Sequence, residues 1–211
     1  MDTGTFADRF IGQLDRALRT LTATPRAVRE TPGQGLPEAE LSADETKHVA
    51  GLMRVNHTGE VCAQALYEGQ ALMAANDQTR TALLAAAQDE IDHLAWCDER
   101  LRELHSRPSV FNAGFYAASY AMGAFTGLLG DKVSLGFVEA TEDQVCEHLQ
   151  NHLDELPQGD AKSRAIIERM FDDEARHGAT AREVGGTEFP PSIKRAMRLV
   201  SKVMTRSSYH V

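Results

Sequence analysis

Several features that mark common protein classes are scarce or missing in this sequence. Its three cysteines, Cys62, Cys97 and Cys146, form no Cys-x-x-Cys pair, which argues against a zinc ribbon or a rubredoxin-type iron site and fits a reducing compartment. No Gly-x-Gly-x-x-Gly loop is present, so no built-in flavin or nicotinamide module is expected. The formal net charge of -9 argues against nucleic acid as a partner.

Proline is also scarce, and runs of β-branched residues are absent, so we expect an all-α fold. Prolines and glycines gather between Pro25 and Pro37, after a short amphipathic pattern that begins near Thr5. We therefore divide the chain into residues 1–41, an N-terminal amphipathic helix with a Pro/Gly linker, and residues 42–211, a helical bundle. The N-terminus lacks a basic region followed by an apolar one, so no secretory signal is expected.

Two acidic motifs of the same form stand out against this background: Asp89-Glu90-Ile91-Asp92-His93 and Asp173-Glu174-Ala175-Arg176-His177. Residues three apart on a helix share a face, so each motif presents a carboxylate and an imidazole together. Another glutamate precedes each motif at a similar distance, 30 residues in one case and 32 in the other. The candidate metal ligands are Glu60, Glu90, His93, Glu142, Glu174 and His177.

The spacing of the second set predicts a helical hairpin. There are 15 residues from Glu142 to Pro157 and 15 from Gly159 to Glu174, so a turn between them brings both carboxylates to the same height. The first set gives 16 and 13 residues about a turn at Asn76, which differ by less than one helical turn. Two such hairpins predict a ferritin-like four-helix bundle with a di-metal centre.

A single Glu-x-x-His on a helix is usually a salt bridge on the surface. The alternative to an enzyme is therefore a helical membrane-surface or assembly factor whose carboxylates only form salt bridges. The duplicated motif with matched partner glutamates favours the metal site. Asp89 and Asp173 are expected either to orient a ligand histidine or to be solvated. His57 is expected beside the site or on the surface rather than as a seventh ligand. Gly59 is expected to mark a close backbone approach.

The stretch from Pro108 to Gly130 contains no charged residue and nominally matches the thickness of a bilayer. Its glycines and hydroxyl groups make it a poor hydrocarbon helix, so we expect the long crossover that a ferritin-like bundle needs. Gly123 and Gly127 would allow close helix packing. The residues expected to face a lipid surface or an apolar tunnel are Phe111, Phe115, Tyr116, Phe125 and Leu128.

A last helix is expected after Pro190-Pro191, with apolar residues on one face and no acidic residue. The positive charge of this helix is opposite in sign to the net charge of the whole chain, which favours contact with an anionic membrane surface. The five cations are Lys194, Arg195, Arg198, Lys202 and Arg206.

Three segments resemble the demethoxyubiquinone hydroxylase family, and the six candidate ligands fall at that family's spacing. The segments are Leu52-Met53-Arg54-Val55-Asn56-His57-Thr58-Gly59-Glu60, Tyr67-Glu68-Gly69-Gln70 and Gly123-Ala124-Phe125-Thr126-Gly127-Leu128-Leu129-Gly130. The resemblance implies a di-iron monooxygenase that hydroxylates a polyprenylated methoxy-benzoquinol with O2 in ubiquinone biosynthesis, using two Fe ions per chain and NADH as external electron donor. It also implies a role for His148 near the site in proton or electron transfer. It assigns no role to residues 1–41.

The resemblance further implies a peripheral membrane protein. The sequence shows no mitochondrial presequence, so we expect a bacterial protein on the cytoplasmic face of the inner membrane. A homo-oligomer is expected. The alternative function is that of another ferritin-like di-iron protein, either iron oxidation and storage or a peroxidase. Storage predicts a soluble cage without an apolar crossover, and a rubrerythrin-like peroxidase predicts a Cys-x-x-Cys domain.

Overall fold

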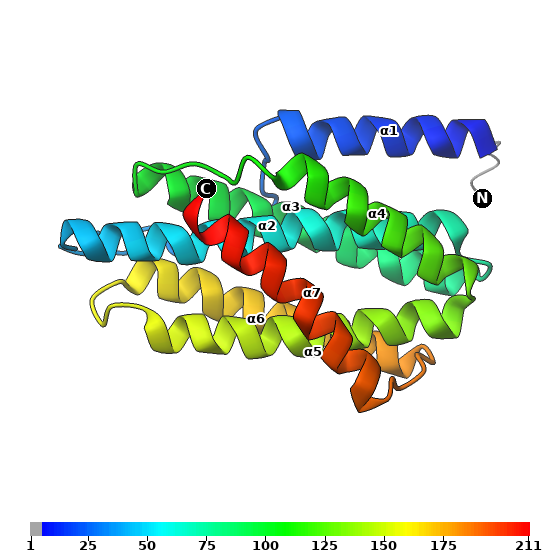
Figure 1. The fold of residues 1–211 in the computed structure, drawn as a ribbon. Coiled ribbons are helices and arrows are strands. Elements are labelled where there is room, and N and C mark those ends of the chain that lie inside the picture. Colours follow the sequence, from blue (N-terminus) through cyan, green and yellow to red (C-terminus); the bar gives the residue numbers. More distant parts are fainter. Residues whose placement is uncertain (1–5) are drawn as a thin grey trace.

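The computed structural model describes residues 6–211 of the chain, and all regular structure in that range is helical (Figure 1). Seven helices and no strand occur among these residues, which confirms the predicted all-α class. The expected start of the N-terminal helix at Thr5 lies outside the described residues. The first helix, α1, covers Phe6–Thr22.

Four long helices form the body of the molecule: α2 (Ala43–Met73), α3 (Asp77–Glu103), α5 (Asp131–Glu155) and α6 (Ala161–Glu183). α2 packs along α3 and α5 packs along α6, and the two hairpins meet chiefly through α3 and α6 (Figure 1). The ferritin-like four-helix bundle predicted from the spacing of the glutamates is confirmed.

The polar residues at the helix starts explain why the long helices begin where they do. Ser42 and Glu45 form a capping box, in which the Ser42 hydroxyl accepts from the Glu45 backbone N–H and the Glu45 carboxylate accepts from the Ser42 N–H. The side chain of Asn76 accepts from the backbone N–H of Gln78, so the turn expected there also starts α3. Asp160 caps α6 in the same way.

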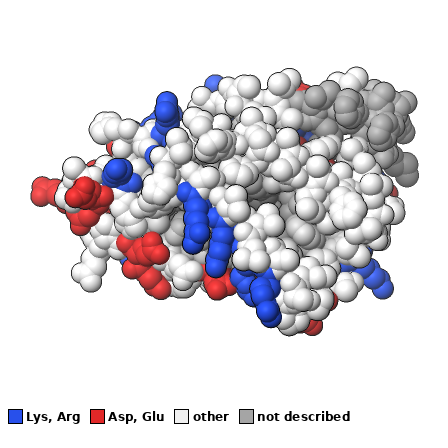
Figure 2. All heavy atoms as spheres, viewed as in Figure 1, with Lys and Arg blue, Asp and Glu red and all other residues white. Residues whose placement is uncertain are grey.

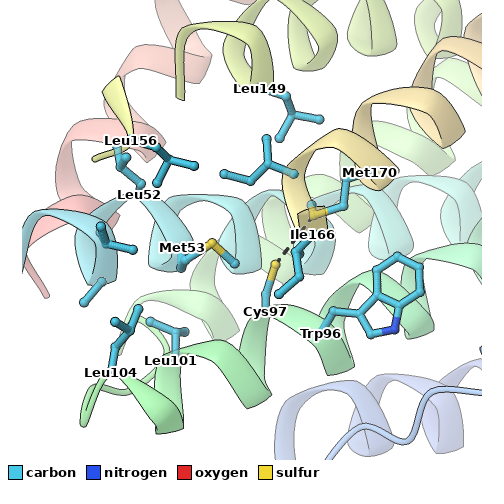
Figure 3. Close-up of a cluster of buried hydrophobic side chains, with 13 residues drawn as sticks. Leu52, Met53, Trp96, Cys97, Leu101, Leu104, Leu149, Leu156, Ile166 and Met170 are labelled. Atoms are coloured by element: carbon cyan, nitrogen blue, oxygen red, sulfur yellow. Dashed lines mark hydrogen bonds between the residues drawn. The ribbon is translucent and has the colours of Figure 1, made fainter. Parts of the chain in front are cut away.

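One end of the bundle is filled by a sulfur-containing apolar core (Figure 3). Met53 from α2, Cys97 from α3 and Met170 from α6 are all fully buried, and the Cys97 thiol donates to the Met170 sulfur at 3.8 Å. Cys97 is therefore a small apolar core residue. Trp96 lies at the edge of this cluster nearest the acidic motifs.

The uncharged crossover forms α4 (Asn112–Leu128), which packs along α2 (Figure 1). A Cβ atom on Gly123 would overlap the Leu66 carbonyl, and one on Gly127 would lie 2.8 Å from Met73 Cβ. The expected close packing through these glycines is confirmed. None of the described helices is both long enough and apolar enough to cross a membrane.

Two expectations for individual residues near this crossover are wrong. Tyr116 is buried and its hydroxyl donates to Glu68 at 2.7 Å, so it does not face outward with Phe111, Phe125 and Leu128. A Cβ atom on Gly59 would meet nothing within 4 Å, so no backbone approaches it closely.

The glycine geometry predicts opposite effects for two Gly→Ala substitutions on facing helices. Gly123→Ala should lower the free energy of unfolding by about 1–3 kcal/mol, because α4 must move off α2 to admit the methyl group. Gly59→Ala should raise it by about 0.5–1 kcal/mol, because alanine restricts the unfolded chain and the site is open. Urea unfolding followed by circular dichroism measures both changes, and equal effects of the two variants would contradict this account of the packing.

The final helix, α7 (Pro191–His210), crosses the outside of α2 and α5 (Figure 1). The Tyr209 ring lies directly over Gly51, and its hydroxyl lies 2.6 Å from His48 Nδ1. Lys194 and Arg198 approach acidic residues of α5, with Lys194 Nζ 3.1 Å from Asp143 Oδ2. The helix is thus fixed to the bundle at both ends.

Candidate metal centre

The bundle brings all six candidate ligands to one level in its interior. Glu60 comes from α2, Glu142 from α5, and each of α3 and α6 supplies one Glu-x-x-His pair. None of the six has more than 7% of its surface exposed. This convergence follows from the matched lengths of the two arms in each hairpin. The number of residues between a glutamate and the turn fixes its height along the bundle, and that number is similar in both arms.

The Nδ1 atom of His93 marks one half of the centre. It lies 3.4 Å from Glu60 Oε2, 3.1 Å from Glu90 Oε2 and 3.1 Å from Glu174 Oε1. Glu60, Glu90, His93 and Glu174 each place one donor atom within 4.8 Å of the others. Three oxygens and one imidazole nitrogen within this distance can share a single metal ion.

The Nδ1 atom of His177 marks the other half. It lies 3.1 Å from Glu174 Oε2 and 3.5 Å from Glu90 Oε1. Glu90 and Glu174 therefore each present one oxygen to either imidazole, an arrangement suited to carboxylates that bridge two ions. Glu142 lies beside this half: a Cβ atom built on Gly178, the residue after His177, would be 3.3 Å from the Glu142 Cβ. The Tyr67 hydroxyl donates a hydrogen bond to Glu142 Oε1.

The electrostatics of the site favour a cation. Burial, together with repulsion from neighbouring carboxylates, raises the pKa of Glu60 and that of Glu142 well above the usual range. Burial alone would lower the pKa of His177, but hydrogen bonds to Glu174 and Glu90 raise it to about 12. Glu142 Oε2 is buried and receives no hydrogen bond from any described residue.

These observations fit a pair of divalent ions such as iron. Carboxylates and imidazoles are the ligands such ions take in ferritin-like bundles, and a cation would relieve the repulsion among four buried carboxyl groups. It would also give the orphan oxygen of Glu142 a partner. The donor set therefore matches the metal centre that the spacing predicts.

Metal binding should release protons, because an ion needs the deprotonated forms of Glu60, Glu142 and His177, whereas their raised pKa values favour the protonated forms in the metal-free protein. Affinity for Co(II) should accordingly rise with pH between about 6 and 8. Isothermal titration calorimetry in buffers of different ionisation enthalpy measures the number of protons released. Heats that do not depend on the buffer would contradict the protonation states described here.

The two acidic motifs orient each other's histidines. His93 Nε2 donates to Asp173 Oδ2 at 3.1 Å, and His177 Nε2 donates to Asp89 Oδ2 at 3.0 Å. Each aspartate therefore belongs to one motif and binds the imidazole of the other. A carboxylate on the outer nitrogen fixes the ring so that Nδ1 faces the metal. Both aspartates therefore orient a ligand histidine, Asp173 from a fully buried position and Asp89 from a partly exposed one.

Two other histidines lie apart from the cluster. His57 is buried, and its Nδ1 lies 3.3 Å from the Asn112 amide nitrogen; burial lowers its pKa to about 4. His148 lies beside His152, with ring centroids 3.9 Å apart and the ring planes tilted by 60°, and its role in proton or electron transfer stays a prediction. Sequence reasoning assigned no role to Tyr67, although it lies seven residues after Glu60 and therefore on the same helix face.

Fold and site together define a ferritin-like bundle protein with a carboxylate–histidine metal centre. The family model described as "Ubiquinone biosynthesis protein COQ7" matches residues 47–208, and the chain belongs to that family. The chain is 57% identical to the 3-demethoxyubiquinol 3-hydroxylase of Azotobacter vinelandii over 97% of its own length and 95% of the relative's. It is also 57% identical to the protein of that name from Stutzerimonas stutzeri, over 97% and 96% of the two chains. The resemblance predicted from the residues is thereby confirmed.

Proposed function

We propose that this chain is a monooxygenase of ubiquinone biosynthesis that hydroxylates the ring of a polyprenylated demethoxyubiquinol with O2. The observation that carries the proposal is the convergence of Glu60, the two Glu-x-x-His pairs and Glu142 inside a bundle of this family. The relatives at 55–57% identity are named for this hydroxylation. Iron storage and peroxidase activity are less well supported, since neither explains the apolar outer face of α4.

Six side chains would hold two iron ions, with Glu90 and Glu174 shared between them. The ions supply the redox chemistry with dioxygen that no side chain of this protein provides. The four carboxylates balance the four positive charges of two Fe(II), so the loaded site is close to neutral. Asp89 and Asp173 keep the imidazoles aimed inward, and Tyr67 holds Glu142 in place.

One oxygen atom of O2 would be inserted into a C–H bond of the quinol ring and the other would leave as water, so each turnover consumes two electrons and two protons from an external source. We propose NADH as the external donor. The sequence contains no nucleotide-binding loop, so this reductant would act without a dedicated cofactor domain in the chain.

The substrate's prenyl tail requires access from a membrane, and we propose peripheral attachment to the cytoplasmic face of a bacterial inner membrane. Phe111, directly before α4, is 46% exposed, and Phe125 and Leu128 of α4 are 56% and 70% exposed. Figure 2 shows this face largely free of charge, with a row of Lys and Arg side chains along α7 beside it. An apolar face bordered by cations suits insertion among anionic lipid headgroups.

The test is complementation of cells that lack this gene, with their quinones analysed by mass spectrometry. Cells without the protein should accumulate the methoxy-bearing, unhydroxylated intermediate, and the wild-type chain should remove it. Metal analysis of the purified protein should give about two irons per chain. Wild-type protein that binds iron but leaves the intermediate unchanged would favour the storage or peroxidase alternative.

A further inference from the structure

The linker that follows α1 is bound along the outside of α3 and α6, so it is part of the wall around the metal centre. The backbone N–H of Val28 donates to Asp92 at 2.6 Å, and the Thr31 hydroxyl donates to Glu99 at 2.7 Å. Further along, Glu38 lies 2.9 Å from the fully buried Arg100. We call residues 25–41 the strap.

Arg29 is the residue of the strap that reaches furthest toward the site. Its Nη1 donates to Asp173 Oδ2 at 2.6 Å, its Nε donates to Asp92, and its Nη2 lies 3.6 Å from Asp89 Oδ1. The guanidinium also lies 4.8 Å from the centre of the Trp96 ring. A planar group with donors on three sides is needed to meet three carboxylates at once.

Two of these carboxylates are the ones that orient the ligand histidines. Asp173 Oδ2 accepts from both Arg29 and His93 Nε2, and Asp89 accepts from His177 Nε2. Trp96, beneath the guanidinium, lies with its ring centroid 5.3 Å from that of His93. Contacts therefore run from Arg29 to both imidazoles through one intervening side chain each.

We propose that the strap is a structural part of the metal centre and that Arg29 is a positioning residue, which sets both histidines by fixing Asp173 and Asp89. This inference rests on the proposed function only in that the six central residues bind divalent metal ions. It gives residues 25–41 a role in metal binding, whereas the family resemblance gave them none.

Charge and orientation make opposite predictions for the loss of Arg29. A positive charge near the centre disfavours another cation, so its removal by itself would tighten metal binding. Loss of the guanidinium, with its several N–H donors, leaves Asp173 and Asp89 free to move. The imidazoles that they orient then become less fixed, which weakens metal binding. Arg176, half exposed, contacts the same two aspartates and keeps part of the orientation, so a partial loss is expected.

The experiment is a Co(II) titration of the full chain after chelation, followed by visible absorption and calorimetry. Arg29→Gln should raise the dissociation constant for Co(II) about 10- to 100-fold and change the visible bands, because ligand orientation is lost. Arg29→Lys should also bind Co(II) more weakly, because an ammonium group keeps the charge but lacks the planar set of donors of a guanidinium. Arg102→Gln, which removes an exposed pair with Asp98 on α3, is the matched control and should bind as the wild type does.

Unchanged or tighter Co(II) binding in Arg29→Gln would overturn the proposal. A lower melting temperature with unchanged Co(II) affinity would also overturn it, because Arg29 would then stabilise the fold without positioning the metal ligands. If Arg29→Gln does not fold, Arg29→Lys decides by the same measure. Failure of the wild-type protein to bind Co(II) would instead refute the metal centre itself, and with it the proposed function.

Discussion

Replacing Glu142 with Gln is expected to abolish quinol hydroxylation and, at the same time, to raise the melting temperature of the metal-free protein. The glutamine keeps the shape of the side chain and still accepts from Tyr67 through its Oε1. It removes a carboxylate that burial and the charges of Glu174 and Glu90 make costly to ionise. Activity should fall at least about 100-fold, since a lost ligand costs more than a lost partner of a ligand.

The sign of the stability change follows from the raised pKa of Glu142. Above pH 4.5 this carboxyl group ionises in the unfolded chain while it stays protonated in the folded one, so the metal-free protein loses stability as the pH rises toward the folded pKa. Glutamine does not titrate and avoids this loss. Each kcal/mol regained should add about 2–4 °C to the melting temperature in a chain of this size.

Differential scanning fluorimetry with a chelator at pH 8, paired with quinol turnover in the iron-loaded protein, measures both effects. The matched control is Glu147→Gln on the same helix, where the side chain is 62% exposed and both quantities should stay at wild-type values. A Glu142→Gln protein that turns over quinol normally would remove Glu142 from the proposed ligand set. One that melts lower than the wild type would contradict the electrostatic account of the empty centre.

Replacing Phe125 with Asp is expected to weaken binding to anionic vesicles at least about tenfold. Burial of a phenylalanine side chain contributes about 1.5–3 kcal/mol, and an aspartate adds repulsion from the lipid headgroups. The same variant should lose more kcat/KM for a long-tailed quinol than for a tail-less one, because only the long-tailed quinol must be drawn from the bilayer. Phe125 is 56% exposed, so the fold should be unaffected.

Vesicle co-sedimentation and turnover with the two quinols measure these losses. Leu84→Asp serves as the matched control, because Leu84 is also an exposed apolar residue but lies on α3. Equal losses with long-tailed and tail-less quinols would argue against entry of the substrate across the outer face of α4. Wild-type vesicle binding by Phe125→Asp would remove this face from the membrane contact.

The bundle and the level of the site were predictable because both depend on local features of the chain. Helix periodicity, the capping box at Ser42 and the turn at Asn76 fix where each helix begins, and a constant rise per residue then fixes which glutamates meet. Gly123 was predictable for the same reason, since small residues one turn apart mark close packing.

What could not be predicted depends on side chains that meet across long stretches of sequence. Arg29 lies 144 residues before Asp173, and nothing in the linker's composition indicates that it binds there. Tyr116 was wrongly predicted to face outward because its hydrogen-bond partner, Glu68, is on another helix. Gly59 was read wrongly because a glycine within a helix does not reveal whether the space beside it is filled.

The crosswise pairing of aspartates and histidines makes the two hairpins dependent on each other. Asp89 of the first hairpin steadies the imidazole of the second, and Asp173 of the second steadies the imidazole of the first. Cut between α4 and α5, the chain would leave each half with an imidazole lacking its anchor. Either half would regain a complete centre only by associating with another acidic hairpin, so reassembly of the severed fragments and recovery of metal affinity should occur as a single event.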